Sequence, residues 1–354
     1  MKCVFNAKQN KHYPKSYLIN GVREPNPESP ERARLLLKGV EAAGMTQVTP
    51  PDYGSNGSDG MNTIMKVHPQ RYLAFLEHAA TRWSHIKGAA DEVTPNIHPT
   101  NRDGEYPKSL VAQAGFHMAD ASCPISTDTW ESALWSSWSA LHAADLVLAG
   151  EPACYALSRP PGHHAGPELA GGFCYLNNTA IAAQRLRERF ERGAILDVDL
   201  HHGNGTQMAF YDRADVLTVS LHAHPERFYP FFWGYESETG ENAGQGYNFN
   251  FPLPRGTKDK IYLETLDRAL QAIEQYQPQA LVIALGLDAY EGDPIAGLAI
   301  STEGFKSIGE MISERLKVPT VIVQEGGYLC PELGQNLAAF IEGFEVTKGQ
   351  LELE

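Results

Sequence analysis

The sequence lacks a long apolar run and an apolar start. None of its apolar stretches approaches the roughly 20 residues needed to cross a bilayer. The first residues, MKCVFNAKQNKHYPKSY, contain no apolar segment of the kind found in secretory signals. We therefore expect a cytoplasmic protein that has no membrane partner.

Cysteine is also scarce, and negative charge outnumbers positive charge. The five cysteines are scattered and no two form a CxxC pair, which argues against a disulfide framework or a cysteine-rich zinc knuckle. The formal net charge of −14 disfavours nucleic acid as a partner, because nucleic-acid binding needs a basic surface. There is no GxSxG elbow, GxGxxG loop or Walker loop, so neither a serine nucleophile nor a nucleotide cofactor is indicated.

The composition itself is that of an ordinary globular enzyme. Of the 354 residues, 42% are hydrophobic and 20% are charged, which suits one large α/β domain with a deep core. No repeat and no linker divides the chain. Glycine, serine, asparagine and aspartate predict a loop from about Pro50 to Gly60. Val93–Ser109 predicts a second loop, longer than an ordinary connection.

Short apolar runs alternate with amphipathic stretches along the rest of the chain. The apolar runs predict five strands, over Cys154–Leu157, Ala194–Val198, Val216–Leu221, Ala280–Leu285 and Pro319–Val323. The amphipathic stretches predict helices over Pro30–Ala43, Pro69–Trp83, Trp130–Ala149, Asn177–Phe190, Lys258–Tyr276, Thr302–Leu316 and Leu333–Phe344. This alternation is typical of a parallel sheet that helices bury on both faces.

A polar cluster follows each of the five predicted strands. In chain order the clusters read RPPGHHAG, DVDLHHGNG, SLHAHP, GLDAYEGDP and QEGGY. Ligands of open parallel sheets bind beyond the carboxyl ends of the strands. We therefore expect the five clusters to converge on one rim and to form a functional site there.

Three residues of these clusters suit a divalent transition metal. Asp199 and His201 are two positions apart, which on an extended segment turns both side chains to the same face. Asp288, which follows the strand Ala280–Leu285, would supply a second carboxylate. Two carboxylates and one imidazole leave coordination positions open, as in a catalytic site. Both Zn(II) and Fe(II) fit such ligands.

Tandem histidines and a tyrosine would complete a hydrolytic site. His163 and His164 lie in a loop that prolines and glycines should hold in order. Metal-assisted amide hydrolysis needs a base for the attacking water and an acid for the leaving amine. Asp197 would favour the protonated form of one imidazole, whereas the neutral amide of Asn204 would only orient the other. Tyr328, after two glycines, would donate a hydrogen bond to the developing oxyanion.

Together these motifs resemble the histone deacetylase and acetylpolyamine amidohydrolase superfamily. The segments that carry the resemblance are RPPGHHA, GGFCYLNN, ILDVDLHHGNGTQ, GLDAYEGDP and QEGGY, in the family's order. The resemblance implies an α/β, three-layer arginase–deacetylase fold, in which a central, mostly parallel sheet lies between helices. It also implies one zinc ion at Asp199, His201 and Asp288, a base/acid pair at His163 and His164, and polarisation of the acetyl carbonyl by Tyr328.

The same resemblance implies the partners of the histidines and a second kind of cation. Asp197 would pair with His163, and Asn204 with His164. Members of the family bind potassium near the zinc site, and the matching positions are Asp197, Asp199, His201, Ser220 and Leu221. A second, more distant potassium site would involve Phe210, Arg213, Val216 and Tyr247.

The substrate tunnel of the family also has matching positions in this chain. They are Gly172, Phe173, Tyr229, Ile295, Tyr17 and Glu28. Tyr229 is expected to face Phe173 across the slot. Tyr17 stands where an acidic residue would meet a polyamine ammonium, so Glu28 is the nearest acidic candidate. Ile295 occupies the gatekeeper position, where a carboxylate would favour polyamines.

Within the superfamily, the chain looks closest to the bacterial acetylpolyamine amidohydrolases. The shared features are its length, the long insertion around residues 86–110, and the segment GYESETG. In those enzymes the insertion contributes to a dimer interface that narrows the active-site mouth. The resemblance therefore implies a single domain over residues 1–354, a homodimer, and deacetylation of acetylpolyamines or similar small acetylated amines.

Other functions remain as alternatives. A protein acetyl-lysine deacetylase would use the same chemistry behind a more open mouth. An arginase-type enzyme with two manganese ions would need further bridging carboxylates, but His202 follows His201. A catalytically inactive binding module would have lost a ligand, a histidine or the tyrosine, and all six positions are intact.

Overall fold

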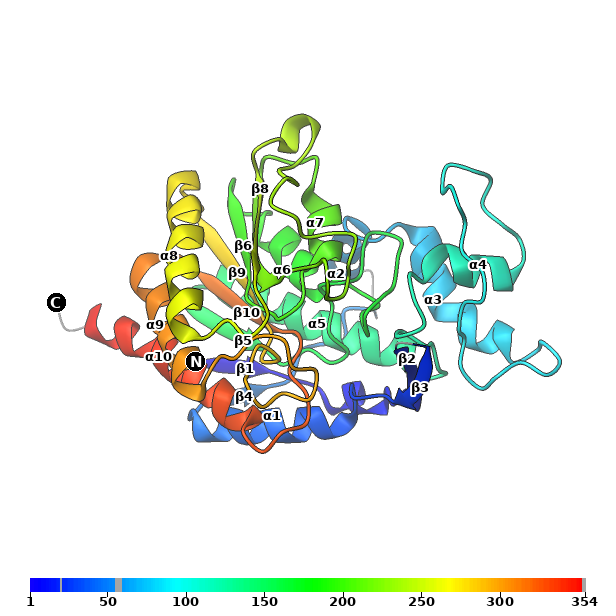
Figure 1. The fold of residues 1–354 in the computed structure, drawn as a ribbon, viewed down its shortest axis with the longest axis horizontal. Coiled ribbons are helices and arrows are strands. Elements are labelled where there is room, and N and C mark those ends of the chain that lie inside the picture. Colours follow the sequence, from blue (N-terminus) through cyan, green and yellow to red (C-terminus); the bar gives the residue numbers. More distant parts are fainter. Residues whose placement is uncertain (20, 55–58, 352–354) are drawn as a thin grey trace.

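A parallel sheet forms the centre of the fold (Figure 1). The computed structural model describes residues 1–19, 21–54 and 59–351. Within these ranges the sheet has eight strands in the order β4-β1-β5-β10-β9-β6-β7-β8, and every neighbouring pair is parallel. The strands are β1 (Lys2–Val4), β4 (Thr46–Val48), β5 (Ala153–Ala156), β6 (Gly193–Asp197), β7 (Val216–Ala223), β8 (Asn248–Leu253), β9 (Ala280–Leu285) and β10 (Thr320–Gln324).

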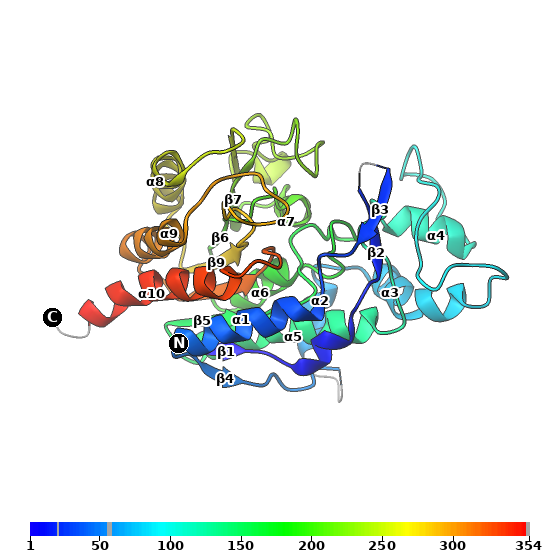
Figure 2. The same ribbon diagram turned by 60° about the horizontal axis from the view of Figure 1, so that its bottom comes forward.

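Helices cover both faces of this sheet (Figures 1 and 2). They are α1 (Pro30–Ala42), α2 (Asp59–Met65), α3 (Gln70–Trp83), α4 (Leu110–His117), α5 (Thr129–Leu148), α6 (Asn178–Leu186), α7 (Asn204–Phe210), α8 (Asp259–Tyr276), α9 (Thr302–Arg315) and α10 (Leu333–Leu351). Short 3-10 helices span Ala7–Lys11 and Asn242–Gly244. A separate antiparallel hairpin pairs β2 (Ser16–Ile19) with β3 (Val22–Pro25). Among the described residues, no helix is both long and apolar enough to span a membrane.

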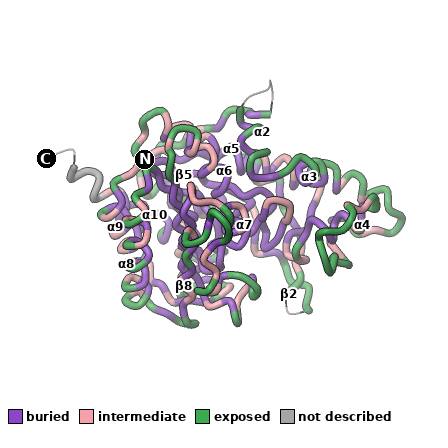
Figure 3. Tube along the Cα trace, turned by 90° about the horizontal axis from the view of Figure 1, so that it is seen from above, coloured by how far each residue is buried: buried purple, intermediate pink, exposed green. Residues whose placement is uncertain are grey.

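The alternation of side chains along each strand creates two hydrophobic cores. In β6, Ala194 and Leu196 belong to the core that includes residues of α1, α8, α9 and α10, whereas Ile195 belongs to the core that includes residues of α3, α5 and α6. This is the two-residue period of a strand that is buried on both faces. The sheet strands accordingly form the buried centre of the molecule in Figure 3.

The main elements predicted from the sequence are confirmed. The five predicted strands occur with ends that differ by no more than two residues, and the seven predicted helices occur as well. Two helix ends differ more. The helix α6 ends at Leu186, whose carbonyl accepts turn hydrogen bonds from the N–H groups of residues 189 and 190, and α10 continues beyond Phe344. The sequence did not predict β1, β4, β8, the hairpin, α2, α4 or α7.

Both predicted loops can be compared with the structure only in part. Of the loop predicted from Pro50 to Gly60, residues 55–58 lie outside the described residues, and α2 already begins at Asp59. No helix or strand is assigned between the end of α3 at Trp83 and the start of α4, apart from an isolated bridge between Val93 and Ile125. This long connection, α3, α4 and the β2–β3 hairpin lie at the end of the molecule remote from α8–α10 (Figures 1 and 2).

Candidate metal centre and active site

The three predicted metal ligands meet beyond the carboxyl ends of β6 and β9. One ligand atom from each of Asp199, His201 and Asp288 lies within 4.8 Å of the other two. The segment after β6 is bent rather than extended as expected, because Asp199 Oδ1 accepts a hydrogen bond of 2.8 Å from the backbone N–H of His201. The backbone N–H of Gly326, after β10, donates to Asp199 Oδ2 at 2.8 Å. Three strands therefore fix the ligand set.

The chemistry of this donor set fits a divalent cation. Nδ1 of His201 lies 3.3 Å from Asp199 Oδ1 and 3.2 Å from Asp288 Oδ2. Asp288 Oδ2 is buried and accepts no hydrogen bond of good geometry. Burial opposes protonation of His201, but the adjacent carboxylates of Asp199 and Asp288 raise its pKa to about 9. A metal ion between these atoms would neutralise the carboxylate charge, which in the absence of a metal favours protonation of His201.

Two glycines allow the backbone to approach the carboxylates closely. A Cβ atom at Gly286 would lie 2.1 Å from Asp199 Oδ2, and one at Gly326 would lie 2.3 Å from Asp288 Oδ2. Any side chain at either position would displace a ligand. The glycines in GLD and EGGY are therefore part of the ligand geometry.

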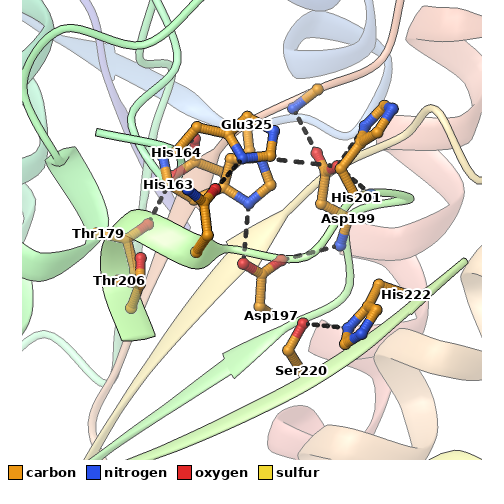
Figure 4. A network of polar contacts seen from close by, with 12 residues as sticks. His163, His164, Thr179, Asp197, Asp199, His201, Thr206, Ser220, His222 and Glu325 are labelled. Atoms are coloured by element: carbon orange, nitrogen blue, oxygen red, sulfur yellow. Dashed lines mark hydrogen bonds and ion pairs between the residues drawn. The ribbon is translucent and has the colours of Figure 1, made fainter. Parts of the chain in front are cut away.

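The tandem histidines lie beside Asp199 and His201, and His163 contacts Asp197 (Figure 4). His163 Nδ1 is 2.9 Å from Asp197 Oδ2, and His164 Nδ1 is 2.7 Å from Asn204 Oδ1. Because both partner oxygens act as acceptors, Nδ1 of each imidazole carries the hydrogen. Nε2 of each ring is therefore free to exchange a proton with a substrate or water in the site. The two ring centroids are 4.0 Å apart, and His163 Nε2 lies 3.7 Å from Asp199 Oδ1.

The surroundings separate the proton affinities of the two histidines. Burial disfavours protonation of His163, but the carboxylates of Asp199 and Asp197 outweigh it and raise its pKa well above 6.5. Burial lowers the pKa of His164 well below 6.5, and the neighbouring His163 and His201 lower it further. The pair can therefore hold one proton while leaving the second imidazole neutral.

Glu325 fixes the histidine loop, a role that the sequence did not reveal. Its Oε2 accepts hydrogen bonds from the backbone N–H groups of Gly162 at 2.6 Å and His163 at 3.0 Å, and its Oε1 accepts one from Thr179 at 2.7 Å. Burial raises the pKa of this carboxyl to about 7. The motif QEGGY was recognised, but only the fold brings its glutamate to a loop 162 positions away.

Asp293 and Arg32 hold Tyr328 and the residues before it. Its backbone N–H donates to Asp293 Oδ2 at 2.8 Å. The guanidinium of Arg32, on α1, lies 4.9 Å from the centroid of the phenol ring. Arg32 also donates to the carbonyls of Gly327 and Glu325, both at 2.6 Å. Arg32 and Asp293 are further residues of the site that sequence reasoning missed.

A cavity of about 610 Å³ opens above these groups. His163, His164, His201 and Tyr328 line it, and so do five of the six predicted tunnel residues: Tyr17, Gly172, Phe173, Tyr229 and Ile295. The ring of Phe173 lies 5.5 Å from Tyr17 and 5.8 Å from Tyr328. The ring of Tyr229 lies 4.8 Å from that of His164.

The prediction that Glu28 meets the substrate is wrong. Glu28 is fully buried and does not line the cavity. Its carboxylate lies 2.8 Å from Arg159 Nε and 3.0 Å from Arg32 Nη1. Burial opposes its ionisation, but these two guanidinium groups lower the pKa of Glu28 below 4.5. Glu28 therefore has a structural role in the interior, where it neutralises two buried arginines.

The residues expected to bind potassium lie at two places. In the first set, Asp197, the last residue of β6, is the register partner of Ser220 within β7. Ser220 Oγ lies 2.8 Å from His222 Nδ1, and Leu221 follows in β7. In the second set, Phe210 ends α7 and its carbonyl accepts the N–H of Arg213 at 3.0 Å.

The other two members of the second set lie nearby. Val216 is the first residue of β7, and the carbonyl of Tyr247 accepts the N–H of Thr218, two residues further along that strand, at 3.1 Å.

Comparison with known proteins assigns the class. The histone deacetylase domain model matches residues 26–344, and the chain belongs to this family. It is 44% identical to an acetylpolyamine amidohydrolase of Burkholderia pseudomallei over 99% of this chain and 100% of that protein. An acetylpolyamine amidohydrolase of Mycoplana ramosa is 40% identical over 97% of this chain and 99% of its own length.

The fold agrees with this assignment. The crystal structure of an acetylpolyamine aminohydrolase from B. pseudomallei matches with a TM-score of 0.93 over 98% of both chains, at 44% identity. The predicted arginase–deacetylase fold is thereby confirmed.

Proposed function

We propose that this protein is a zinc-dependent amidohydrolase that removes acetyl groups from acetylated polyamines or similar small acetylated amines. One observation carries the proposal: the Asp199–His201–Asp288 set lies at a cavity that is also lined by two partnered histidines and by Tyr328. The names of the most similar relatives support the choice of substrate.

The metal would be held by Asp199, His201 and Asp288. When bound there, a zinc-class ion would supply the positive charge that polarises the acetyl carbonyl. Fe(II) is compatible with the same ligands. Elemental analysis of the purified protein would distinguish these two metals.

The protein's own groups would move the protons. A neutral imidazole of the pair, with Nδ1–H bound by its partner, accepts the proton of the attacking water at Nε2. A protonated imidazole then donates a proton to the departing amine. Asp197 stabilises the imidazolium form of His163, whereas Asn204 fixes the orientation of His164. The phenol of Tyr328 donates to the oxygen on which negative charge develops.

We also propose two potassium ions and a homodimer. The side-chain oxygens of the register partners Asp197 and Ser220, and the backbone carbonyls of Phe210 and Tyr247, are ligands of the kind that a hard cation takes. The connection that includes residues 86–110 extends the end of the molecule that carries the β2–β3 hairpin, and Leu18 and Ile19 of that hairpin line the cavity. A partner that packs there would narrow the entrance.

A comparison of substrates tests the proposed function. We expect N-acetylputrescine and N-acetylcadaverine to be hydrolysed with a higher kcat/KM than an acetyl-lysine peptide, because a peptide must lie across a crowded mouth. The measurement is release of acetate by the zinc-loaded protein. A peptide that is preferred by a wide margin would instead make the chain a protein deacetylase, and hydrolysis of no acetamide would reject the proposal.

A further inference from the structure

Asp120 lines the active-site cavity but has none of the roles described above. Among the described residues that line this cavity, the carboxylates are Asp199 of the metal centre and Asp120. We propose that Asp120 is a positioning residue that holds the two walls of the substrate slot together. The proposal rests on the proposed function, because it concerns the slot in which an acetamide would react.

Backbone pairing delivers Asp120 to the slot. Ala119 donates its N–H to the carbonyl of Ala170 at 2.7 Å, and Ala170 donates to the carbonyl of His117 at 2.7 Å. The segment after α4 therefore runs beside the GGFC turn. The carboxylate is oriented by the backbone N–H of Ser122, which donates to Oδ1 at 2.8 Å.

The other oxygen of Asp120 joins two segments that are distant in the sequence. Its Oδ2 accepts the backbone N–H of Gly172 at 3.1 Å and the hydroxyl of Tyr229 at 2.7 Å. Burial raises the pKa of Tyr229 well above 10, and the carboxylate of Asp120 raises it further, so the phenol stays a donor. One oxygen atom thus ties the GGFC turn to the loop after β7.

The GGFC turn needs such a tether. Gly172 has φ +49° and Phe173 has φ +69°, a left-handed conformation that is unfavourable for phenylalanine and persists only when its surroundings impose it. The packing is tight as well. A Cβ atom at Gly171 would lie 3.0 Å from the hydroxyl of Tyr229, and one at Gly172 would lie 2.5 Å from His164 Cδ2.

Through these two walls, Asp120 acts on the reacting groups. The ring of Tyr229 meets that of His164 edge-on, with centroids 4.8 Å apart and an angle of 86°. The ring of Phe173 lies 5.8 Å from that of Tyr328. Without Asp120 both rings could shift, although no reacting side chain would be lost. Small displacements of this kind misalign a substrate with its acid, base and oxyanion donor.

Kinetics of zinc-loaded variants on N-acetylputrescine test the proposal. We expect Asp120→Ala to lower kcat/KM about a hundredfold, mainly through kcat. Asp120→Asn should lose less, because its amide oxygen can still accept the hydrogen bonds from Gly172 and Tyr229, although the bond from the N–H of Ser122 is lost. Asp128→Asn is the control: it removes the same charge from an exposed residue before α5 whose side chain does not cap the helix, and it should retain wild-type kinetics.

A double-mutant cycle with Tyr229→Phe tests whether Asp120 acts through this partner. If it does, Tyr229→Phe should cost little more in the Asp120→Ala background, since the hydrogen bond is already gone. Losses that multiply would show independent roles and overturn the proposal. Should Asp120→Ala fail to fold, Tyr229→Phe alone replaces it: loss of this one hydroxyl should lower kcat/KM, and an unchanged kcat/KM would overturn the proposal.

Hydrogen exchange provides a readout that needs neither metal nor turnover. In metal-free protein, a peptide that contains Gly172 should exchange faster in Asp120→Ala than in wild type or Asp128→Asn, because its amide has lost its acceptor. Unchanged exchange together with unchanged kcat/KM would overturn the proposal. A wild-type protein that hydrolyses no acetamide, but shows this difference in exchange, would reject the proposed function and leave the hydrogen bonds of Asp120 supported.

Discussion

Tyr328→Phe is expected to lower kcat on an acetamide by a factor of about 10² to 10³ while the zinc content stays at the wild-type level. The substitution removes only the hydroxyl that would donate to the oxyanion. The backbone N–H bond to Asp293 and the stacking of Arg32 on the ring do not involve that hydroxyl. The measurement combines steady-state kinetics with elemental analysis of the same sample.

A second tyrosine provides the control for this variant. Tyr276, on α8, is half-buried and donates its hydroxyl to the carbonyl of Ala214 at 3.0 Å, away from the cavity. Tyr276→Phe should leave kcat unchanged. Wild-type turnover in Tyr328→Phe would refute the oxyanion role, and a loss of zinc would show that the tyrosine acts on the metal site instead.

Asp288→Asn is expected to abolish turnover because the protein no longer retains its metal. The change is nearly isosteric, and the amide oxygen can still accept the N–H of Leu200, which lies 3.0 Å from Asp288 Oδ1. It replaces the other buried oxygen, which faces His201, by an NH₂ group that cannot bind a cation. Since even outer partners of metal ligands contribute 10- to 100-fold to affinity, we expect zinc affinity to fall by more than about a hundredfold.

The control is a carboxylate with a purely structural role. Asp259, at the start of α8, accepts hydrogen bonds from the N–H and hydroxyl of Ser301 at 2.9 and 2.6 Å. Asp259→Asn should keep both zinc and activity. Full activity of Asp288→Asn with zinc bound would remove Asp288 from the ligand set.

The strands that the sequence predicted are those buried by apolar side chains on both faces. β8 was missed because its pattern is inverted: Asn248 and Asn250 face inwards, where both donate to Gln207 Oε1. An alternation of asparagine and phenylalanine predicts the opposite orientation. β1 and β4 were missed because three residues are too few for a periodicity to emerge.

The site was predictable where its chemistry needs rare residue types in fixed motifs. Two aspartates, three histidines and a tyrosine, which follow four of the five predicted strands, were sufficient to predict where they converge. Residues that only position these groups through hydrogen bonds could not be recognised from a sequence motif. Glu325 and Asp120 act through backbone N–H groups that are remote in the sequence, and any acidic residue could do so. The location of Glu28 in the amino-terminal loop suggested a substrate contact. The structure instead pairs Glu28 with Arg32 of α1 and with Arg159 of the RPPG segment, and only the fold brings Arg159 to it.

Anomalous X-ray scattering from crystals of the zinc-loaded protein tests the central claim most directly. Difference maps recorded above and below the zinc absorption edge should show one zinc ion per chain, bound by Asp199, His201 and Asp288 at about 2.0–2.2 Å. Two ions at this site, or a zinc ion that does not contact all three side chains, would contradict the account.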